Sequence, residues 1–308
     1  MNALIGSSEV MWRLNARLER LAALEANVLI EGETGTGKEL AARSIHSKSS
    51  RSGGPFVALN CGALPRTLLE SQLFGCAKGT FTGASEDRRG LCEEANGGVL
   101  FLDEIGELPL EAQASLLRFL DSGEIMRLGE NRSRRCDVRV IAATNRELQS
   151  MMASGAFRSD LYYRLSALKV SMPPLSSHVE DIGQLARHFL CQIGGEYQLS
   201  DEAVEALMRR RWPGNVRELR NVLWQAVERA DSGRRITADC IPVEYWSAGV
   251  SCCEPLQCRE TSLTEAIEQL RDSMIRKALQ DCRGNMCLAA RKLGIHRNTL
   301  RNFMNRQL

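Results

Sequence analysis

The sequence predicts an α/β fold with a parallel sheet, followed by a helical region and then a small all-α domain. Short, continuous apolar strands alternate with helical stretches over residues 1–171, a pattern typical of a parallel sheet covered on both faces. Strand signals stop over residues 172–240, where only helical stretches remain. Residues 241–262 contain two prolines and no periodicity, so we interpret them as a linker to a helical domain over residues 263–308.

The α/β part opens with a predicted amphipathic helix over residues 9–25, whose apolar stripe consists of Val10, Leu14, Leu18, Leu21 and Leu24. A further helix is predicted over residues 38–46. The predicted strands cover residues 27–30, 56–59, 98–102 and 138–143. Ligands of parallel α/β sheets bind outside the carboxyl ends of the strands, so the motifs at those ends form the candidate site.

The rest of the chain is predicted to be helical. Three helices, over residues 179–194, 200–210 and 215–230, form the region that follows the sheet. After the linker, apolar residues recur at helical spacing from Leu263 to Ala278, and two short helices follow.

Composition places the chain among ordinary globular proteins, with 25% charged and 44% hydrophobic residues. The net charge of +2 neither favours nor excludes nucleic acid as a partner. The eleven cysteines show no C-x-x-C spacing, which disfavours a zinc or redox site. The N-terminus lacks the pattern of a signal peptide, and no run of about 18 apolar residues occurs. We therefore expect a reduced, cytoplasmic protein without a membrane span.

A glycine-rich turn lies between the first strand and its helix. It reads Gly32-Glu33-Thr34-Gly35-Thr36-Gly37-Lys38, a G-x-x-x-x-G-K pattern in the context that a phosphate-binding loop requires. Backbone N–H groups and the helix N-terminus would surround phosphate oxygens, and Lys38 would reach the β- and γ-phosphates. Glu39 replaces the usual Ser or Thr, so Mg²⁺ must depend more on another carboxylate. The alternative is a glycine turn formed by chance.

Two carboxylates, Asp103 and Glu104, follow the third strand. Asp103 is the candidate Mg²⁺ ligand, through water, and Glu104 is the candidate general base for an attacking water. A solvated strand end is the alternative, and the nearby phosphate loop makes it the weaker one. Thr144-Asn145 closes the fourth strand, where an amide side chain can sense a γ-phosphate.

Two further features stay open on the residues alone. Arg158 and Arg164 lie on one polar and aromatic segment. They either stabilise transition-state charge or are ordinary surface charges or a helix-capping pair, which is the better interpretation without further context. The loop KGTFTGA, residues 78–84, brackets Phe81 with glycines. Its ring either folds back into the core or contacts another molecule.

Together these motifs resemble the sigma-54 activator branch of the AAA+ ATPases, the bacterial enhancer-binding proteins. The resemblance runs from about Leu4 to Ile236 and resumes near the C-terminus. It implies an AAA+ P-loop ATPase with a helical lid at residues 172–240, with ATP and Mg²⁺ as cofactors. GETGTGKE, including Glu39, resembles the Walker A motif of this branch, and Asp103 and Glu104 match its Walker B motif.

The resemblance implies roles for further residues. Asn60 matches an asparagine that restrains the catalytic glutamate until the partner is engaged, and Thr144-Asn145 matches sensor I. Arg158 and Arg164 match arginine fingers that reach the ATP of a neighbouring subunit, which implies a ring, usually a hexamer. Arg217 matches the sensor II arginine, directed toward the nucleotide phosphates.

GTFTGA is similar to the signature loop of this branch, which contacts sigma-54 and is raised and lowered by ATP hydrolysis. The loop consists of Gly79, Thr80, Phe81, Thr82, Gly83 and Ala84. Thr80 stands where the family usually has alanine, so Thr80→Ala is expected to be neutral or mildly activating. Cys76-Ala77 and Ser176-Ser177-His178 also depart from the family pattern, and neither removes a catalytic group.

Residues 285–301 resemble a Fis-type helix-turn-helix, in which Gly294 supplies the turn. The candidate base and phosphate contacts are Arg297, Asn298, Thr299 and Arg301. The preceding helix, residues 263–279, is a candidate dimerisation helix. The alternative is a basic, solvated helix that caps the domain.

The implied function is an ATP-hydrolysing activator that binds upstream enhancer DNA and remodels sigma-54 RNA polymerase, as a homo- or hetero-hexamer. The ATPase region begins near residue 1, so we expect control in trans by a regulatory protein. That arrangement resembles the short subgroup with phage-shock and Hrp-type activators, which implies stress or type III secretion genes as targets. One alternative is a DNA-binding regulator that uses ATP only as an assembly switch, without sigma-54 contact. Another is a remodeller of other proteins, which would not need the helix-turn-helix.

Overall fold

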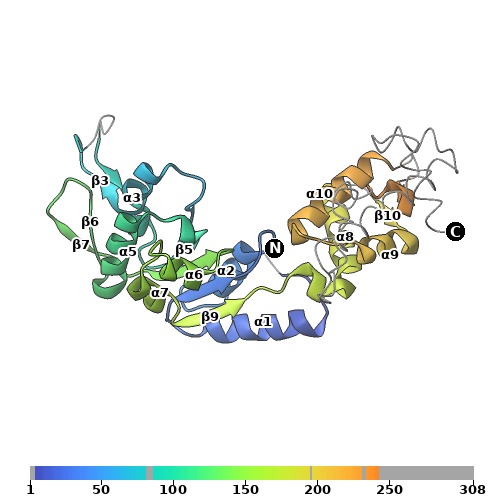
Figure 1. Cartoon of the computed structure of the whole chain (residues 1–308), viewed down its shortest axis with the longest axis horizontal. Coiled ribbons are helices and arrows are strands. Elements are labelled where there is room, and N and C mark those ends of the chain that lie inside the picture. The colour runs from blue at the N-terminus through green and yellow to red at the C-terminus, as the bar shows by residue number, and fades with distance from the viewer. Residues whose placement is uncertain (1–3, 81–85, 195, 231–233, 243–308) are drawn as a thin grey trace, which may run out of the picture. The chain divides into compact units, whose positions relative to one another are not determined.

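The computed structural model describes residues 4–80, 86–194, 196–230 and 234–242 (Figure 1). All of them belong to the first of two compact units, which ends at Val243. Several predicted features lie outside the described residues: most of the linker, the helix-turn-helix with Arg297, Asn298, Thr299 and Arg301, and the loop residues Phe81, Thr82, Gly83 and Ala84.

A five-stranded parallel sheet forms the centre of the α/β part, in the order β2-β5-β8-β1-β9. The strands are β1 (Val28–Glu31), β2 (Phe56–Asn60), β5 (Val99–Asp103), β8 (Arg139–Thr144) and β9 (Leu168–Ser171). The predicted α/β fold is confirmed.

The strands differ from the prediction in two respects. The four predicted strands each end one residue later than expected, because backbone pairing continues past the last apolar residue to a polar one, and β1, β5 and β8 also begin one residue later. The edge strand β9 is not apparent from the sequence, since it is short and only Val170 in it is buried.

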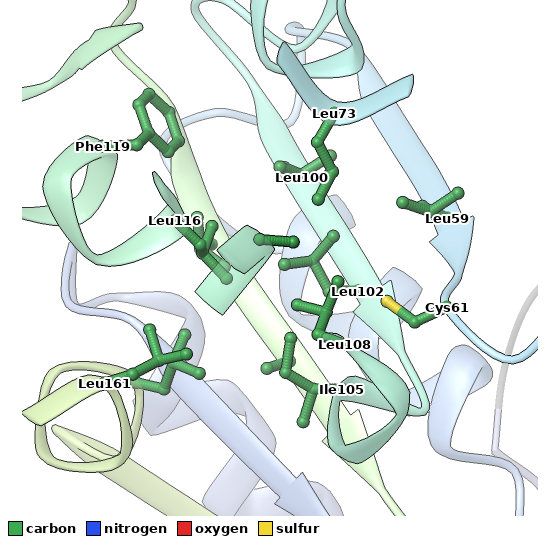
Figure 2. Packing of buried hydrophobic residues seen from close by; sticks show 14 of the residues in the cluster. Leu59, Cys61, Leu73, Leu100, Leu102, Ile105, Leu108, Leu116, Phe119 and Leu161 are labelled. Carbon is green, nitrogen blue, oxygen red and sulfur yellow. The ribbon is translucent and has the colours of Figure 1, made fainter. Parts of the chain in front are cut away.

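Helices cover both faces of the sheet (Figure 1). The larger ones are α1 (Glu9–Ala22), α2 (Lys38–Ser47), α3 (Arg66–Phe74), α5 (Leu110–Ser122) and α7 (Ser159–Leu165). Strand β5 shows why two covers are needed, because its side chains alternate between faces. Leu100 and Leu102 share a core with residues of α3, α5 and α7 (Figure 2), whereas Val99 and Phe101 pack with residues of α1 and α2.

The first helix is shorter than predicted, and its predicted apolar stripe is confirmed at Leu14, Leu18 and Leu21 but not at its two ends. It ends at Ala22, and its buried apolar positions begin at Met11 instead of Val10. Val10 is 36% exposed, and Leu24, beyond the helix end, is 47% exposed. The helix begins after Ser8, whose side chain accepts a hydrogen bond from the N–H of Met11.

Two small hairpins are inserted among these elements. One pairs β3 (Gly75–Cys76) with β4 (Arg88–Arg89), and the other pairs β6 (Glu124–Met126) with β7 (Ser133–Arg135). The short helices of this part are α4 (Leu91–Glu94), α6 (Leu148–Ala153) and the 3₁₀ turn Ile105–Glu107.

The lid contains α8 (Ile182–Ile193), α9 (Asp201–Arg209) and α10 (Asn215–Glu228), which share a core of their own. Short 3₁₀ turns accompany them at Leu175–Ser177, Val179–Asp181 and Ala238–Cys240. The expectation of an all-helical lid is wrong in one detail. The lid also contains a short parallel pair, β10 (Gln198–Leu199) with β11 (Arg235–Ile236), in which Leu199 lies opposite Ile236.

Within the described part of the chain, no helix is long and apolar enough to cross a membrane. The six cysteines described there are free. No group of three or more His, Cys, Asp or Glu side chains among these residues is arranged to hold a metal ion.

Candidate nucleotide site and loop base

The register of the sheet brings the predicted site residues to one edge. Asn60 lies opposite Asp103 across β2 and β5, and Glu31 lies opposite Thr144 across β1 and β8. The phosphate-loop residues 32–37 leave β1 at the same edge and enter α2 at Lys38. This is the carboxyl edge, where parallel sheets bind ligands.

Lys38 is held inside the phosphate loop. Its buried Nζ donates to the carbonyl oxygens of Gly32 at 2.8 Å and Glu33 at 3.0 Å. Burial lowers the pKa of Lys38, while the nearby charges of Asp103 and Glu104 oppose that shift. Gly35 and Gly37 have φ values of +82° and +91°, a left-handed backbone that glycine adopts without steric cost.

A cavity of about 460 Å³ lies against this loop. Its charged and hydroxyl lining includes Thr36, Lys38, Asp103 and Arg217. Its apolar lining includes Leu4, Ile5, Met172, Leu185, Phe189 and Val216. A cavity of this size, with a few convergent polar groups and an apolar remainder, suits a ligand that carries both phosphates and a flat organic base.

Glu104 adopts a strained backbone next to this cavity. Its φ is +54°, in a region uncommon for residues other than glycine, and its N–H donates to Asp103 Oδ1 at 3.0 Å. A Cβ atom on Gly62 would lie 2.0 Å from Glu104 Oε2, so the carboxylate occupies the space that this glycine leaves free.

Asn60 reaches this carboxylate only indirectly. Its Oδ1 accepts a hydrogen bond of 2.8 Å from the N–H of Gly62. Among the described residues no hydrogen bond joins Asn60 to Glu104. The restraint that the family resemblance implies therefore stays a prediction, with Gly62 as the intervening residue.

The residues present fit a magnesium ion at Asp103. Its carboxylate lines the cavity with Lys38, and carboxylate oxygens are ligands that Mg²⁺ prefers. Glu39 lines the same cavity, but its Oε1 pairs with the Arg43 guanidinium at 2.7 Å. Glu39 is therefore less available as a metal ligand than Asp103.

Asn145 contacts the phosphate loop directly, since its Nδ2 donates to Thr34 Oγ1 at 3.0 Å. Thr144 and Asn145 line a second hollow of about 350 Å³ with Gly32 and Glu33. This position suits a side chain that senses what the loop binds.

The structure does not bring the two arginines to this cavity. The side chain of Arg158 pairs with Asp160 at 2.7 Å, and its N–H donates to the buried Gln113 at 2.9 Å. The half-exposed side chain of Arg164 donates to the carbonyl oxygen of Leu120 and pairs with Asp121 at 3.1 Å. Neither arginine lines the cavity of its own chain.

Asp181 is a residue of the site region that the sequence does not reveal. It is fully buried and accepts hydrogen bonds from the N–H groups of Ser7 at 2.7 Å and Ser8 at 2.9 Å. His178 Nδ1 lies 3.2 Å from its other oxygen. Asp181 therefore anchors the N-terminal segment whose Leu4 and Ile5 line the cavity. Only the contact across 174 residues distinguishes this aspartate from other acids.

We expect Asp181→Ala to lower the free energy of unfolding by about 3 kcal/mol, because buried donors each cost about 1–3 kcal/mol when they lose their acceptor. Burial raises the pKa of Asp181, but hydrogen bonds from Ser8 and Ser7 outweigh it and hold the pKa below its ordinary 3.8. A carboxylate with a depressed pKa stabilises the fold fully above the unfolded value and ceases to do so as pH falls through the folded value. The parent–variant difference in chemical unfolding should therefore shrink below about pH 4.

The matched control is Glu180→Ala, which removes an exposed acid from the same turn. It should change stability by less than about 0.5 kcal/mol. A parent-like stability for Asp181→Ala at pH 7 would contradict the anchoring role.

The base of the GTFTGA loop is tied to the β6–β7 hairpin. Thr80 Oγ1 lies within donating distance of the carbonyl oxygens of Ala77 at 2.6 Å and Leu128 at 3.0 Å. The N–H of Ala77 donates to the same Leu128 oxygen at 2.9 Å. Across the loop, the N–H of Lys78 donates to Asp87 at 2.8 Å. Thr80 thus adds a connection that an alanine would lack.

Three family models match the chain. They are the sigma-54 interaction domain over residues 4–171, the AAA+ ATPase lid domain over residues 176–252, and the bacterial regulatory protein, Fis family, over residues 266–306. The last covers the predicted helix-turn-helix.

Similar proteins agree with these models. The regulatory protein AtoC of Escherichia coli (strain K12) is 44% identical over 96% of this chain and 66% of its own length. The Nif-specific regulatory protein of Azotobacter vinelandii is 48% identical over 78% of this chain and 47% of its own. The chain thus spans about half to two thirds of these curated relatives.

A solved structure extends the likeness to three dimensions. The crystal structure of NtrX from Brucella abortus in complex with ATP matches with a TM-score of 0.73 and 33% identity, over 98% of this chain and 68% of that chain. Over more than half of its length, and with a lid and a Fis-type segment in the order of that group, the chain belongs to the sigma-54 interaction domain family of AAA+ transcriptional regulators.

Proposed function

We propose that this chain hydrolyses ATP with Mg²⁺ and uses the cycle to remodel sigma-54 RNA polymerase from a closed to an open promoter complex. The observation that carries the proposal is the cavity in which Lys38, Asp103 and Arg217 meet. A bound Mg²⁺ would neutralise phosphate charge, with Asp103 holding it through water. Lys38 binds the phosphates, and Glu104 accepts a proton from the attacking water.

A physical path from this cavity to the loop supports coupling. Asn60 and Gly62 lie beside Glu104, and α3 begins four residues after Gly62 and ends at Phe74, directly before β3 and the loop base. Leu69 and Leu73 anchor α3 in the core, and Glu70 accepts a 2.8 Å hydrogen bond from Ser115 of α5. A change at the Glu104 carboxylate is therefore transmitted by one packed helix toward residues 78–84.

DNA binding and assembly complete the proposal. The Fis-type segment tethers the protein to upstream enhancer DNA through Arg297, Asn298, Thr299 and Arg301. The exposed Arg158 and Arg164 serve the nucleotide of a neighbouring subunit in a homo- or hetero-hexameric ring.

The test is to separate hydrolysis from output with Phe81→Ala. If the ring contacts sigma-54, the variant should keep its melting temperature and basal ATPase rate and lose sigma-54 capture in the presence of an ATP transition-state analogue. A buried Phe would instead cost about 3–5 kcal/mol on truncation. Large destabilisation with sigma-54 binding retained would place Phe81 in the core. Full open-complex formation by the variant would show that the Phe81 ring is not the sigma-54 contact, and absence of sigma-54 capture by the parent would favour the assembly-switch alternative.

Thr80 offers a matched pair at the loop base. Thr80→Ser keeps the hydroxyl that reaches Ala77 and Leu128, and Thr80→Ala removes it. If Thr80→Ala matches the parent in sigma-54 capture, as the usual alanine at this position suggests, then Thr80→Ser should match it too. A loss confined to Thr80→Ala would show that this chain depends on the hydroxyl.

A further inference from the structure

Asn215 occupies an unusual position at the start of α10. Its side chain is fully buried, and its φ of +50° lies in the left-handed region. Such a backbone costs free energy in a residue other than glycine and persists where the surroundings hold it. The turn before it is close to the phosphate loop, since a Cβ atom on Gly35 would lie 2.2 Å from the carbonyl oxygen of Gly214.

The Asn215 amide joins three segments that are distant in sequence. Its Nδ2 donates to Glu33 Oε2 at 2.9 Å and to the carbonyl oxygen of Thr34 at 3.1 Å, both in the phosphate loop. Its Oδ1 accepts from the N–H of Leu175, at 2.7 Å, where the chain enters the lid. A primary amide supplies two N–H donors and an acceptor, a combination that neither a carboxylate nor an apolar side chain offers.

Two neighbours connect this amide to the chemistry. Asn215 donates to the carbonyl oxygen of Thr34, and Asn145 Nδ2 donates to the hydroxyl of the same threonine at 3.0 Å. Arg217 follows Asn215 by two residues on α10 and lines the cavity with Lys38. Asn215 therefore joins the phosphate loop to the start of the helix that carries Arg217.

We propose that Asn215 is a positioning residue that sets α10, and with it Arg217, against the phosphate loop. The inference rests on the ATPase activity proposed above. Phosphates that bind the loop act on Glu33 and Thr34, the two acceptors of Asn215. The lid then follows the loop through this amide, and Arg217 reaches the phosphates only while the amide is engaged.

The test exchanges donor and acceptor. Asn215→Asp removes the donor to Thr34 and sets a carboxylate against that of Glu33, so kcat/KM for ATP should fall at least about tenfold, as expected for a broken charge-assisted contact. Glu33→Gln in that background returns an N–H donor to the pair. Because a side-chain oxygen at 215 still accepts from Leu175, the exchange addresses the phosphate-loop contact alone.

The four proteins form a double-mutant cycle. We expect a coupling factor of at least about fivefold in kcat/KM between positions 215 and 33, whatever Glu33→Gln does by itself. If lower melting temperatures account for the whole loss of kcat/KM and positions 215 and 33 show no coupling, the positioning role is overturned and Asn215 has only a structural role. Absence of ATP turnover in the parent would instead contradict the proposed function.

Hydrogen exchange of the unaltered protein decides the matter if Asn215→Asp does not fold. Pro173 and Pro174 have no N–H, so a peptide over residues 172–175 reports Leu175 almost alone. A non-hydrolysable ATP analogue should slow its exchange at least about threefold if the lid follows the loop through Asn215. Unchanged exchange at Leu175, with analogue binding shown separately, would overturn the inference.

Discussion

Glu104→Gln is expected to bind ATP as the parent does and to hydrolyse it about 10²–10⁴-fold more slowly, the usual contribution of a positioned general base. The amide keeps the shape that fits beside Gly62 but cannot accept the proton of the attacking water. Lys38→Ala should fail differently. It removes the buried ammonium from the phosphate loop and should weaken nucleotide binding itself.

Two measurements separate these outcomes: equilibrium binding of a fluorescent ATP analogue and steady-state phosphate release. Glu111→Gln, an exposed acid in the first turn of α5, is the matched control and should resemble the parent in both. Hydrolysis at the parent rate by Glu104→Gln would show that another group is the base. Tight ATP binding by Lys38→Ala would remove the lysine from the phosphate site.

Arg164→Ala is expected to reduce ATP turnover by about 10³-fold, the scale of an arginine that stabilises transition-state charge in phosphoryl transfer. The structure places Arg164 outside the lining of the cavity in its own chain and in contact with Leu120 and Asp121. We therefore expect Arg164 to act on the nucleotide of a neighbouring subunit. Turnover per subunit of the parent should accordingly rise with protein concentration as rings assemble.

Mixing Arg164→Ala with Lys38→Ala subunits tests this directly. In an equal mixture about one quarter of head-to-tail interfaces combine an intact phosphate loop with an intact arginine, so part of the activity should return. Arg20→Ala, an exposed arginine in the last turn of α1, controls for loss of positive charge. If turnover per subunit did not depend on protein concentration and mixing restored no activity, Arg164 would not act at the nucleotide of a neighbouring subunit.

The sequence by itself determined the features that depend on neighbouring residues. The apolar strands, the G-x-x-x-x-G-K turn and the carboxylates after Leu102 are local patterns. The strands form the predicted sheet, and the turn and the carboxylates lie at its carboxyl edge. The ends of the strands were harder to predict from the sequence, because Asn60 and Thr144 join the sheet only through pairing with strands that are distant in sequence. At the ends of the first helix, Met11 and Ala22 are buried in place of Val10 and Leu24 for the same reason, since packing against the sheet decides which positions are covered.

Only the tertiary structure decided how the site is held together. Asn215 contacts Glu33 across 182 residues, and Asp181 contacts Ser7 across 174. No periodicity or spacing reveals such a pair, because an asparagine at the start of a helix and an aspartate in a turn are favourable there on local grounds alone. Thr80 is similar, since its hydroxyl gains significance only from Leu128 on another hairpin. Local propensity selects these residue types, and the long-range fold determines the hydrogen bonds that they make.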